Sequence, residues 1–510
     1  MDNTKPVRVR FAPSPTGPLH MGGVRTALYN YLFAKKHGGD FILRIEDTDQ
    51  TRFVPGAEQY IVEALKWCGI QPNEGIGFGD GNYKPYRQSE RKSMYRQYAE
   101  QLVKNGHAYY AFDTTEELEE ARTRIEKAGG SFSYNAISRQ NLKNSISLSE
   151  DEVKKKLDAH EHYVIRIKIP RNEEVRLQDI IRGWVVVNSS QMDDKVLFKS
   201  DGMPTYHLAN VVDDYLMKIT HVIRGEEWLP SAPLHVLLYR YLGWEDAMPQ
   251  FAHLPLLLRP DGNGKLSKRD GDRLGFPVFP LNWIDPVTKE QSSGYREKGY
   301  FPDAFINMLA LLGWHASGNK ELFSLNELVQ EFSLERVSKH GAKFDPEKTK
   351  WFNQQYLRNK SDEELAKEFQ SKEERTKNKD FEYIKSVCKL IKEKAHFLNE
   401  FWSLGSYFFV EPDTYDNEVI KKRWNDKTKS FIAELAQEYK AIEKEFSAQT
   451  AETVFKQTCE KTGMKTGEVM QLFRVCISGL GGGPALFEVA NLIGCNDVVK
   501  RLETVVEKIK

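Results

Sequence analysis

Long apolar runs are missing from this sequence of 510 residues, and so is a leader of the secretory kind. No apolar run approaches the roughly 20 residues of a membrane-spanning helix. The first ten residues, MDNTKPVRVR, lack the apolar segment and the small-residue cleavage site of a secretory signal. We therefore expect a soluble, cytoplasmic protein with no membrane partner.

Cysteine is scarce, and no two cysteines have the C-x-x-C spacing. The five cysteines are Cys68, Cys388, Cys459, Cys476 and Cys495. An odd, dispersed set predicts reduced and mostly buried thiols rather than a disulfide framework or a zinc site built on cysteines.

An excess of charge of either sign is also missing, because Lys plus Arg and Asp plus Glu both total 73. Nucleic-acid binders often have a basic excess, so this balance argues against a protein held by phosphate contacts alone. A basic face balanced by an acidic one stays open. The chain is longer than one hydrophobic core usually serves, which predicts three to five domains.

The first fifty residues have the clearest secondary-structure pattern. Apolar and polar residues alternate over residues 7–11, which predicts a strand, and the turn-rich stretch APSPTGPLHMGG follows. Apolar residues then recur at helical spacing over residues 24–32. A second strand is expected over residues 41–45, before an acidic loop that begins at Glu46. This order of strand, loop, helix and strand is the opening unit of a doubly wound nucleotide-binding sheet.

The middle of the chain mixes helical and strand patterns, which predicts an inserted α+β segment. A charged helix is expected over residues 114–127, and strands over residues 163–169 and 184–188. A second strand–helix unit is expected over residues 221–224 and 232–242. Beyond about residue 300 the strand patterns fade and Lys- and Glu-rich amphipathic segments predict a mostly helical C-terminal half.

The first motif suited to chemistry is His20-Met21-Gly22-Gly23, between the first strand and the first helix. Helix N-termini present unpaired N–H groups and partial positive charge, which attract phosphate. The glycines let a ligand approach the backbone, and His20 is suited to donate a hydrogen bond to a phosphoryl group. The alternative is a glycine-rich connecting turn with a surface histidine.

The second motif is Lys265-Leu266-Ser267-Lys268-Arg269, in the stretch RPDGNGKLSKRDG. A mobile loop with several cations suits the charge that develops on departing pyrophosphate. The glycine spacing of a Walker P-loop is absent. The alternative is a solvated basic loop.

Together, H-x-G-G and K-L-S-K-R about 245 residues later resemble the paired HIGH and KMSKS signatures of class I aminoacyl-tRNA synthetases. The opening RFAPSPTGPLHMGGVRTALYNYLFAKKHGGDFILRIEDTD resembles that of glutamyl-tRNA synthetases of the bacterial and organellar type. Further similar stretches are HVIRGEEWLPSAPLH, KLSKRDG, FDPEKTKWFN and GPALFEVANLIG. The resemblance thus covers nearly the whole chain.

The resemblance implies a two-step reaction. The α-carboxylate of L-glutamate attacks the α-phosphorus of ATP, which gives glutamyl-adenylate and pyrophosphate. The 2′-hydroxyl of the 3′-terminal adenosine of tRNA-Glu then attacks the activated carbonyl and releases AMP. Mg²⁺ enters with ATP, and the enzyme is expected to be a monomer.

The resemblance also assigns residues to the two small substrates. The side-chain carboxylate of glutamate is expected among Arg10, Tyr206 and Arg224. Its α-amino and α-carboxyl end is expected at Ser14, Glu46 and Asn210. The expected catalytic residues are His20, Lys265 and Lys268. The remaining ATP-binding residues are expected to be Gly22, Gly23, Trp228, Leu257 and Leu258.

These glutamate assignments agree with the chemistry of the side chains. Guanidinium groups bind carboxylates in bidentate fashion, and an acidic residue suits an ammonium group. Tyr206 and Asn210 share one face if their segment is helical. The alternative is that Arg10 and Arg224 are surface charges at strand ends, paired with Glu46 or with Glu226.

The helical C-terminal half is typical of glutamyl enzymes of this type, whereas the related glutaminyl enzymes read the anticodon with β-barrels. By resemblance, Arg474, Pro484 and Leu486 contact anticodon bases. Arginine can stack on splayed bases and leucine can pack against one. The alternative for Leu486 and Phe487 is a packing pair at the start of a helix.

Two departures from the family's pattern are evident. Many bacterial relatives carry a zinc-binding Cys/His cluster in the inserted domain, but no cysteine lies between Cys68 and Cys388 here. His107 alone cannot supply a four-ligand site, so we expect no structural zinc and no other protein-bound metal. The segment of residues 274–298 is longer than usual, and an ordered loop beside the active-site lid is expected there.

The expected fold class is an α/β Rossmann-like catalytic domain with an α+β acceptor-binding insertion, followed by an all-α C-terminal half. The expected segments are two Rossmann halves (1–87 and 201–255), the acceptor-stem-binding insertion (88–200), a stem-contact domain with the KLSKR loop (256–345) and two helical anticodon-binding domains (346–430 and 431–510).

Three other functions are compatible with parts of the sequence. A glutaminyl-tRNA synthetase is disfavoured by HMGGVRTA, by RGEEW and by the helical C-terminal half. A paralogue that glutamylates a modified tRNA base lacks an anticodon-binding half, so the length argues against it. A non-catalytic RNA-binding protein built on a decayed synthetase is disfavoured by the intact His20, Gly22, Lys265, Lys268, Glu46 and Arg224.

Overall fold

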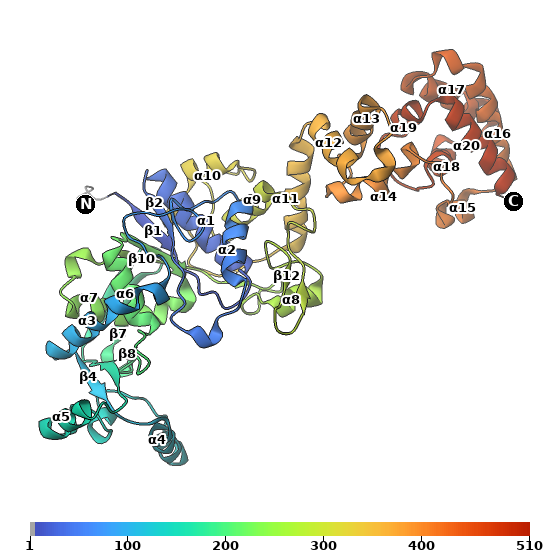
Figure 1. Cartoon of the computed structure of the whole chain (residues 1–510). Helices are drawn as coiled ribbons and strands as arrows, with labels where there is room; N and C mark the ends of the chain where they lie inside the picture. The colour runs from blue at the N-terminus through green and yellow to red at the C-terminus, as the bar shows by residue number, and fades with distance from the viewer. Residues whose placement is uncertain (1–5, 510) are drawn as a thin grey trace. The chain divides into compact units, whose positions relative to one another are not determined.

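The computed structural model describes residues 6–509, and its contacts divide the chain into two units (Figure 1). The first unit runs to Lys298 and continues over Pro302–Pro346. The second comprises Gly299–Phe301 and Glu347–Lys510. Each unit contains its own buried hydrophobic cluster.

The first unit opens with the expected order of strand, loop, helix and strand. Its elements are β1 (Arg8–Phe11), α1 (Met21–Lys36), β2 (Asp40–Leu43), α2 (Ala57–Trp67) and β3 (Glu74–Gly75). The three strands form a parallel sheet in the order β1-β2-β3. The period-two pattern did not predict burial correctly, because all four residues of β1 are buried. Ion pairs of Arg8 and Arg10 with acidic side chains make this burial tolerable.

A second sheet stands beside the first. It contains β6 (Glu174–Asp179), β7 (Gly183–Asn188), β9 (His221–Gly225) and β10 (Gln250–Leu254) in the order β7-β6-β10-β9. Strand β10 runs parallel to β9 and β6. Strand β9 adjoins β1, since the Thr220 N–H donates to the Arg8 carbonyl at 2.9 Å. The two strands thus begin side by side. Further along them, Arg10 of β1 and Arg224 of β9 are close enough for their charges to interact, in the region where open α/β sheets bind ligands.

Helices cover these strands. They are α3 (Lys92–Lys104), α6 (Tyr206–Leu216) and α7 (Ala232–Tyr241). Helix α6 packs on α3 and α7, and apolar residues of these helices share one buried cluster with β9 and β10. The predicted second strand–helix unit is thus present as β9 and α7.

The inserted segment is α+β, as expected. It contains β4 (Ala108–Ala111), α4 (Thr115–Lys127), α5 (Glu150–Asp158), β5 (Val164–Ile167) and β8 (Val196–Phe198), the three strands forming an antiparallel sheet. A capping box between Thr114 and Glu117 begins α4. Strand β7, which the sequence placed in this insertion, instead pairs with β6 and so belongs to the sheet that contains β9.

The last part of the first unit contains short elements. They are β11 (Leu257–Leu258), α8 (Lys268–Leu274), β12 (Trp283–Ile284), β13 (Gln291–Ser292), α9 (Pro302–Ala310), α10 (Leu325–Glu331) and β14 (Ala342–Lys343). Strand β11 pairs with β14, and β12 with β13 as an antiparallel hairpin. The hairpin gives the long segment of residues 274–298 an ordered structure.

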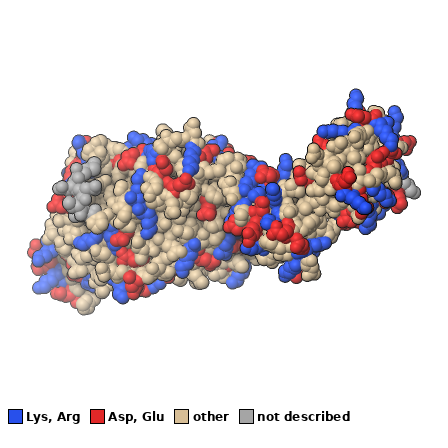
Figure 2. All heavy atoms as spheres, turned by 90° about the horizontal axis from the view of Figure 1, so that it is seen from above, with Lys and Arg blue, Asp and Glu red and all other residues tan. Residues whose placement is uncertain are grey.

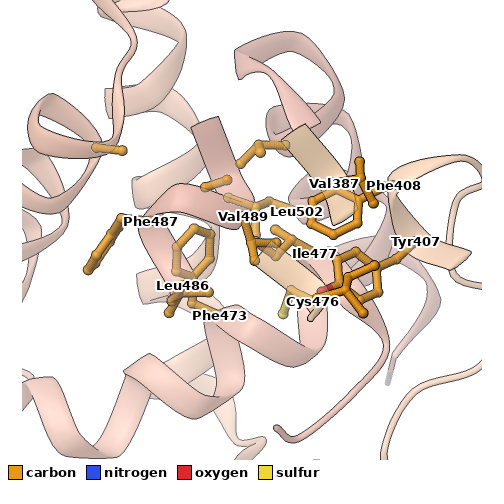
Figure 3. Close-up of a cluster of buried hydrophobic side chains, with 14 of the residues drawn as sticks. Val387, Tyr407, Phe408, Phe473, Cys476, Ile477, Leu486, Phe487, Val489 and Leu502 are labelled. Atoms are coloured by element: carbon orange, nitrogen blue, oxygen red, sulfur yellow. The ribbon is translucent and has the colours of Figure 1, made fainter. Parts of the chain in front are cut away.

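The second unit is helical. Its helices are α11 (Pro346–Asn359), α12 (Asp362–Lys372), α13 (Phe381–Ile391), α14 (Phe401–Gly405), α15 (Asn417–Arg423), α16 (Asp426–Ala441), α17 (Ala448–Thr462), α18 (Thr466–Ser478), α19 (Leu486–Ile493) and α20 (Cys495–Lys508). Side chains from α13, α18, α19 and α20 meet in one buried cluster (Figure 3). The expected boundary between residues 430 and 431 falls inside α16, and the buried cluster continues across it.

The five cysteines are buried and free, which confirms the prediction of reduced, buried thiols. No helix among residues 6–509 is long and apolar enough to cross a membrane. Basic and acidic side chains are interspersed over the face shown in Figure 2 rather than separated into regions of one sign.

Candidate active site

The carboxyl ends of β1, β2 and β9 meet helix α6, and this junction gathers most of the residues expected to bind glutamate. Arg10 lies on β1 and Arg224 on β9, while Glu46 follows β2. Tyr206 and Asn210 lie one helical turn apart at the start of α6, as their spacing predicted. Glu46 bonds to Asn210 and Arg224 to Tyr206, while Arg10 is linked to Glu46 through Asp214 and Arg44.

A buried carboxylate, Asp214, holds two of the arginines. It accepts hydrogen bonds from Nε and Nη2 of Arg10, at 3.0 and 3.2 Å, and from Nη1 of Arg44 at 2.8 Å. Burial favours the neutral acid, but the two guanidinium groups outweigh it and lower the pKa of Asp214. Asp214 is only 2% exposed, so this is an interior ion network.

Glu46 is fixed at the edge of the same network. Its Oε1 accepts from Arg44 Nη2 at 2.8 Å and from Asn210 Nδ2 at 3.1 Å. The alternative of a surface charge at Arg10 paired with Glu46 is therefore wrong, because Arg10 is buried and pairs with Asp214.

Arg224 differs from Arg10 because it is buried without a carboxylate. Its Nη1 donates to the Tyr206 hydroxyl at 2.8 Å, and its Nε donates to Nε2 of His253 at 3.0 Å. In the part of the chain that the structure describes, no acidic side chain pairs with it. Burial lowers the pKa of Arg224. Glu226, the partner considered from the sequence, pairs with Arg182 instead.

Two further candidates are exposed to solvent, Trp228 beside Arg224 and Ser14 in the loop beside Glu46. Trp228 lies against the ring of Tyr206, with centroids 4.5 Å apart, and is 41% exposed. Ser14 is exposed in the loop after β1, next to Pro13, whose carbonyl accepts from the Glu46 N–H at 3.0 Å. These side chains can therefore contact a ligand that reaches the buried arginine from solvent.

His20 caps helix α1. Its Nδ1 accepts a hydrogen bond from the Gly22 N–H at 3.1 Å, which leaves the proton on Nε2. Nε2 is buried and has no hydrogen-bond partner among the described residues. Burial, and next the charge of Lys265, lower the pKa of His20 to about 4, so the ring is neutral at pH 7. Nε2–H of the neutral His20 ring is thus a hydrogen-bond donor that a ligand can use.

Strand β11 lies against this helix start. A Cβ added to Gly22 would stand 3.7 Å from Leu257 Cδ1, whereas one added to Gly23 would clash with Leu19 at 2.5 Å. Leu257 is buried and Leu258 is partly exposed. A side chain at position 23 would therefore require Leu19 to move, whereas one at position 22 would make ordinary contacts with His20 and Leu257.

Both lysines of the KLSKR motif pair with carboxylates. Lys265 Nζ lies 3.3 Å from Glu227 Oε1, and Lys268 Nζ lies 2.7 Å from Glu290 Oε2. The residues after α8 return to the first motif, since the Met21 N–H donates to the Val278 carbonyl at 2.8 Å. The His20 and Phe279 rings stand edge to face. Residues 278 and 279 thus lie against the first motif, and the charge of Lys265 acts on His20.

The candidates in the second unit differ in exposure. Arg474 of α18 is half-buried, and a Cβ on Gly483 would stand 3.1 Å from its Nη1. No acidic side chain of residues 6–509 pairs with it. Pro484 and Leu486 are both buried, and Leu486 begins α19 inside the cluster of Figure 3. The packing alternative describes the position of Leu486 and of Phe487.

Groups of three or more His, Cys, Asp or Glu side chains with metal-binding geometry are not found among the described residues. His107 stacks on Tyr241, with ring centroids 4.1 Å apart. It therefore serves an aromatic contact in this structure.

Sequence reasoning missed several residues of the site. They are Arg44, Asp179, Asp214, Glu227 and His253. A signal for Asp214 existed, because it lies four residues after Asn210 and eight after Tyr206 on one helix face. Nothing local marks Asp179 or His253, which meet only through the pairing of β6 with β10.

Comparison with known proteins agrees with this geometry. Residues 6–351 match the model for the catalytic domain of class I tRNA synthetases (E and Q), and residues 357–506 match an anticodon-binding domain. The chain is similar to the glutamate–tRNA ligase of Cytophaga hutchinsonii, with 55% identity over 98% of this chain and 97% of the relative. It is 55% identical to that of Flavobacterium johnsoniae over 99% of this chain and 100% of the relative.

A solved structure is similar throughout. The crystal structure of a glutamate tRNA ligase from Elizabethkingia meningosepticum, in complex with its amino acid, has a TM-score of 0.93 and 50% sequence identity, covering 99% of this chain and 100% of that one. With two matching family models and relatives that are similar over nearly their full length, the chain belongs to the glutamate–tRNA ligases, a family of class I aminoacyl-tRNA synthetases.

Proposed function

We propose that this chain activates L-glutamate with ATP and transfers the glutamyl group to the 3′-terminal adenosine of tRNA-Glu. The observation that carries the proposal is Arg224, a buried guanidinium without a carboxylate partner among the described residues, at the switch point between β1 and β9. A buried unpaired cation is costly, and the side-chain carboxylate of glutamate would neutralise it.

The glutamate subsite follows from the neighbours of Arg224. Tyr206 orients its Nη1, while Arg10 has Nε and Nη2 bound to Asp214 and Nη1 left for a ligand. These three residues would hold the side-chain carboxylate, and Ser14, Glu46 and Asn210 the α-amino and α-carboxyl end. Glutamine would leave Arg224 without an ion partner, which accounts for selectivity against it.

The ATP subsite is proposed between α1 and β11. Nε2 of His20 would donate to a phosphate oxygen, and Gly22, which has no side chain, would let the nucleotide approach the backbone, with Leu257 and Leu258 beside it. The N-terminus of α1 adds partial positive charge, and the exposed Trp228 can cover the adenosine. Mg²⁺ would enter as part of the MgATP substrate.

The two signature lysines would exchange partners during the reaction. Lys265 leaves Glu227, and Lys268 leaves Glu290, to bind the phosphates of the departing pyrophosphate. Both pairs are exposed, so each contributes only about 0–1 kcal/mol and yields readily to a polyanion. The side chains form no covalent bond in this scheme: they position the substrates and stabilise charge.

The units and segments would divide the tRNA between them. The insertion with β4, β5 and β8 would bind the acceptor end, residues 256–345 the stem and the helical second unit the anticodon. In that unit the half-buried Arg474 would be the base contact, whereas the buried Pro484 and Leu486 would support the loop beside it. The proposed enzyme is a monomer with tRNA-Glu as its macromolecular partner.

A charging assay tests the proposal. Purified chain is incubated with ATP, labelled glutamate and either tRNA-Glu or tRNA-Gln, with labelled glutamine as the control amino acid. Transfer of glutamate to tRNA-Glu is expected. Transfer to tRNA-Gln as well would make the enzyme non-discriminating, and failure with both tRNAs would overturn the proposal.

A further inference from the structure

Arg224 depends on a buried chain of side chains that reaches back into the β6–β7 hairpin. Nε of Arg224 donates to Nε2 of His253 at 3.0 Å, and Nδ1 of His253 lies 2.6 Å from Oδ2 of Asp179. His253 is fully buried and Asp179 is 1% exposed. Three strands thereby contribute one residue each, since Arg224 lies on β9, His253 on β10 and Asp179 at the end of β6.

The hydrogen bonds fix the tautomer of His253. An acceptor for Arg224 requires a lone pair on Nε2, so the ring proton must be on Nδ1, where it donates to Asp179. Asp179 is itself held by the backbone, because its Oδ1 accepts from the N–H groups of Ile181 at 2.9 Å and Arg182 at 2.8 Å. The direction of every donor in the chain is therefore determined.

A neutral acceptor suits the role of Arg224. Arg10 has a carboxylate partner, Asp214, which neutralises much of its charge. The imidazole of His253 accepts a hydrogen bond from Nε of Arg224 without neutralising its charge. Burial lowers the pKa of His253, which moves it further below physiological pH. The terminal nitrogens of Arg224 then keep their charge for a ligand, and the Nε contact fixes the plane of the guanidinium.

We propose that Asp179 and His253 are positioning residues for the glutamate subsite, which hold Arg224 in the plane and charge state that select a carboxylate ligand. The inference rests on the proposed function, because it concerns the same subsite. It also connects the β6–β7 hairpin, which lies in the chain between β5 and β8 of the inserted sheet, to the residue that reads the amino acid.

Asp179→Asn is the sharpest test. Oδ1 of residue 179 accepts from the backbone N–H groups of Ile181 and Arg182, whereas the backbone N–H of His253 is shared between Oδ1 and Oδ2. The new amide nitrogen therefore loses fewer hydrogen bonds at the position of Oδ2, where it faces Nδ1 of His253. His253 Nδ1 would then become an acceptor and Nε2 would carry the proton, placing two donors opposite each other at Arg224. The expected result is a rise of about tenfold or more in the KM for glutamate, with kcat and the KM for ATP changed less than about twofold.

Two substitutions at residue 253 distinguish a role in positioning Arg224 from a purely structural role. His253→Gln places its amide near Nε2 and can still accept from Arg224, whereas His253→Asn places it near Nδ1 and keeps only the contact with Asp179. Positioning predicts a larger rise in the KM for glutamate in His253→Asn than in His253→Gln. A purely structural tie between β6 and β10 predicts the reverse order, with losses in thermal stability.

All variants are assayed as full chains with tRNA-Glu, and their folding is checked by circular dichroism and thermal melting. A folded Asp179→Asn enzyme with an unchanged KM for glutamate would overturn the inference. So would equal effects of the two substitutions at residue 253. Failure of the wild-type chain to charge tRNA-Glu would instead contradict the proposed function. Failure of the inference and failure of the proposed function are therefore distinguishable.

Discussion

At the scale of single residues, the three central arginines differ mainly in what surrounds them. Arg44 lies between Asp214 and Glu46, and Arg10 shares Asp214, whereas Arg224 contacts only neutral groups among the described residues. The same side chain can therefore stabilise the interior at one position and be kept for a ligand at another. Substitutions at these positions should separate stability from binding.

Arg224→Ala removes the proposed ligand of the glutamate side chain. A charge-assisted bidentate contact in a buried site contributes several kcal/mol, so the KM for glutamate should rise by about a hundredfold or more. The KM for ATP should stay within about twofold, because His20 and the KLSKR motif are unchanged. Steady-state charging with each substrate varied in turn measures both constants, and an unchanged KM for glutamate would remove Arg224 from the subsite.

Asp214→Asn tests the network that fixes Arg10 and Arg44. Breaking a buried pair leaves charge uncompensated, so the free energy of unfolding should fall by about 3–5 kcal/mol near pH 7. The pKa of Asp214 is lowered in the folded state, so its stabilisation is present above the unfolded pKa of about 3.9 and is lost as pH falls through the lower folded value.

The pH dependence supplies the control for this substitution. Urea unfolding of wild type and Asp214→Asn is measured at several pH values down to about pH 3, as far as both chains remain folded. The difference between them should be constant above about pH 5 and should shrink below about pH 4. A difference that grows as the pH falls would contradict the assigned charge of Asp214.

At the scale of elements, helix α8 begins at Lys268, so the start of this helix determines where the lysine can reach. Lys268→Ala should lower the rate of glutamyl-adenylate formation by about a hundredfold or more, since it removes charge stabilisation from departing pyrophosphate. The dissociation constant for tRNA should change less than twofold. ATP–pyrophosphate exchange with tRNA present gives the rate, and Lys289→Ala, which removes an exposed charge from the β12–β13 turn, is the control.

Glu290, in the turn of the β12–β13 hairpin, should compete with the nucleotide for Lys268. Glu290 is exposed, and an exposed pair contributes about 0.2–1 kcal/mol, so Glu290→Gln should strengthen ATP binding by about two- to threefold at low salt. The gain should fade as added salt shortens the Debye length below about 10 Å. Calorimetry measures the affinity, and Glu63→Gln, which breaks an exposed pair with Arg296, is the matched control. Equal gains in both variants would contradict the competition.

The elements also show why sequence patterns predicted some features and not others. The sequence predicts the bounds of helix α4 almost to the residue. Its start is marked locally, because Thr114 and Glu117 form a capping box. Strand β1 was found, but its buried arginines were not, since their partners lie in α6 and around β3. The β6–β7 hairpin was assigned to the insertion because nothing in its residues identifies β10 as its neighbour. Local signals were readable, whereas pairings between distant segments were not.

The same distinction holds inside the candidate site. His20, Lys265 and Lys268 lie in contiguous motifs whose resemblance to known signatures could be recognised. Asp179 and His253 are 74 positions apart and are joined by hydrogen bonds from the ring and the backbone N–H of His253, so no local pattern predicts them. Leu486 is a different case. The family resemblance assigns it to an anticodon base, but its side chain is 5% exposed and lies in a hydrophobic cluster.

At the scale of the whole molecule, the two units have separate buried clusters, so their stabilities should be separable. Phe473 is fully buried in the second unit, with ring contacts to Phe455 and Tyr439. Phe305 is fully buried in the first, where its ring meets Trp67 and Tyr295. Each is therefore a matched probe of one core.

Phe473→Ala should destabilise the second unit by about 3–5 kcal/mol, because truncating a buried phenylalanine removes apolar contacts and leaves a cavity. Scanning calorimetry of the full chain should show a lowered transition for that unit and an unchanged one for the first. Phe305→Ala should give the converse. Glutamate at about a hundred times its dissociation constant should stabilise only the transition that Phe305→Ala lowers, by about 2.7 kcal/mol, because the proposed subsite lies wholly in the first unit. A single transition that both substitutions lower equally would show that the two cores melt as one.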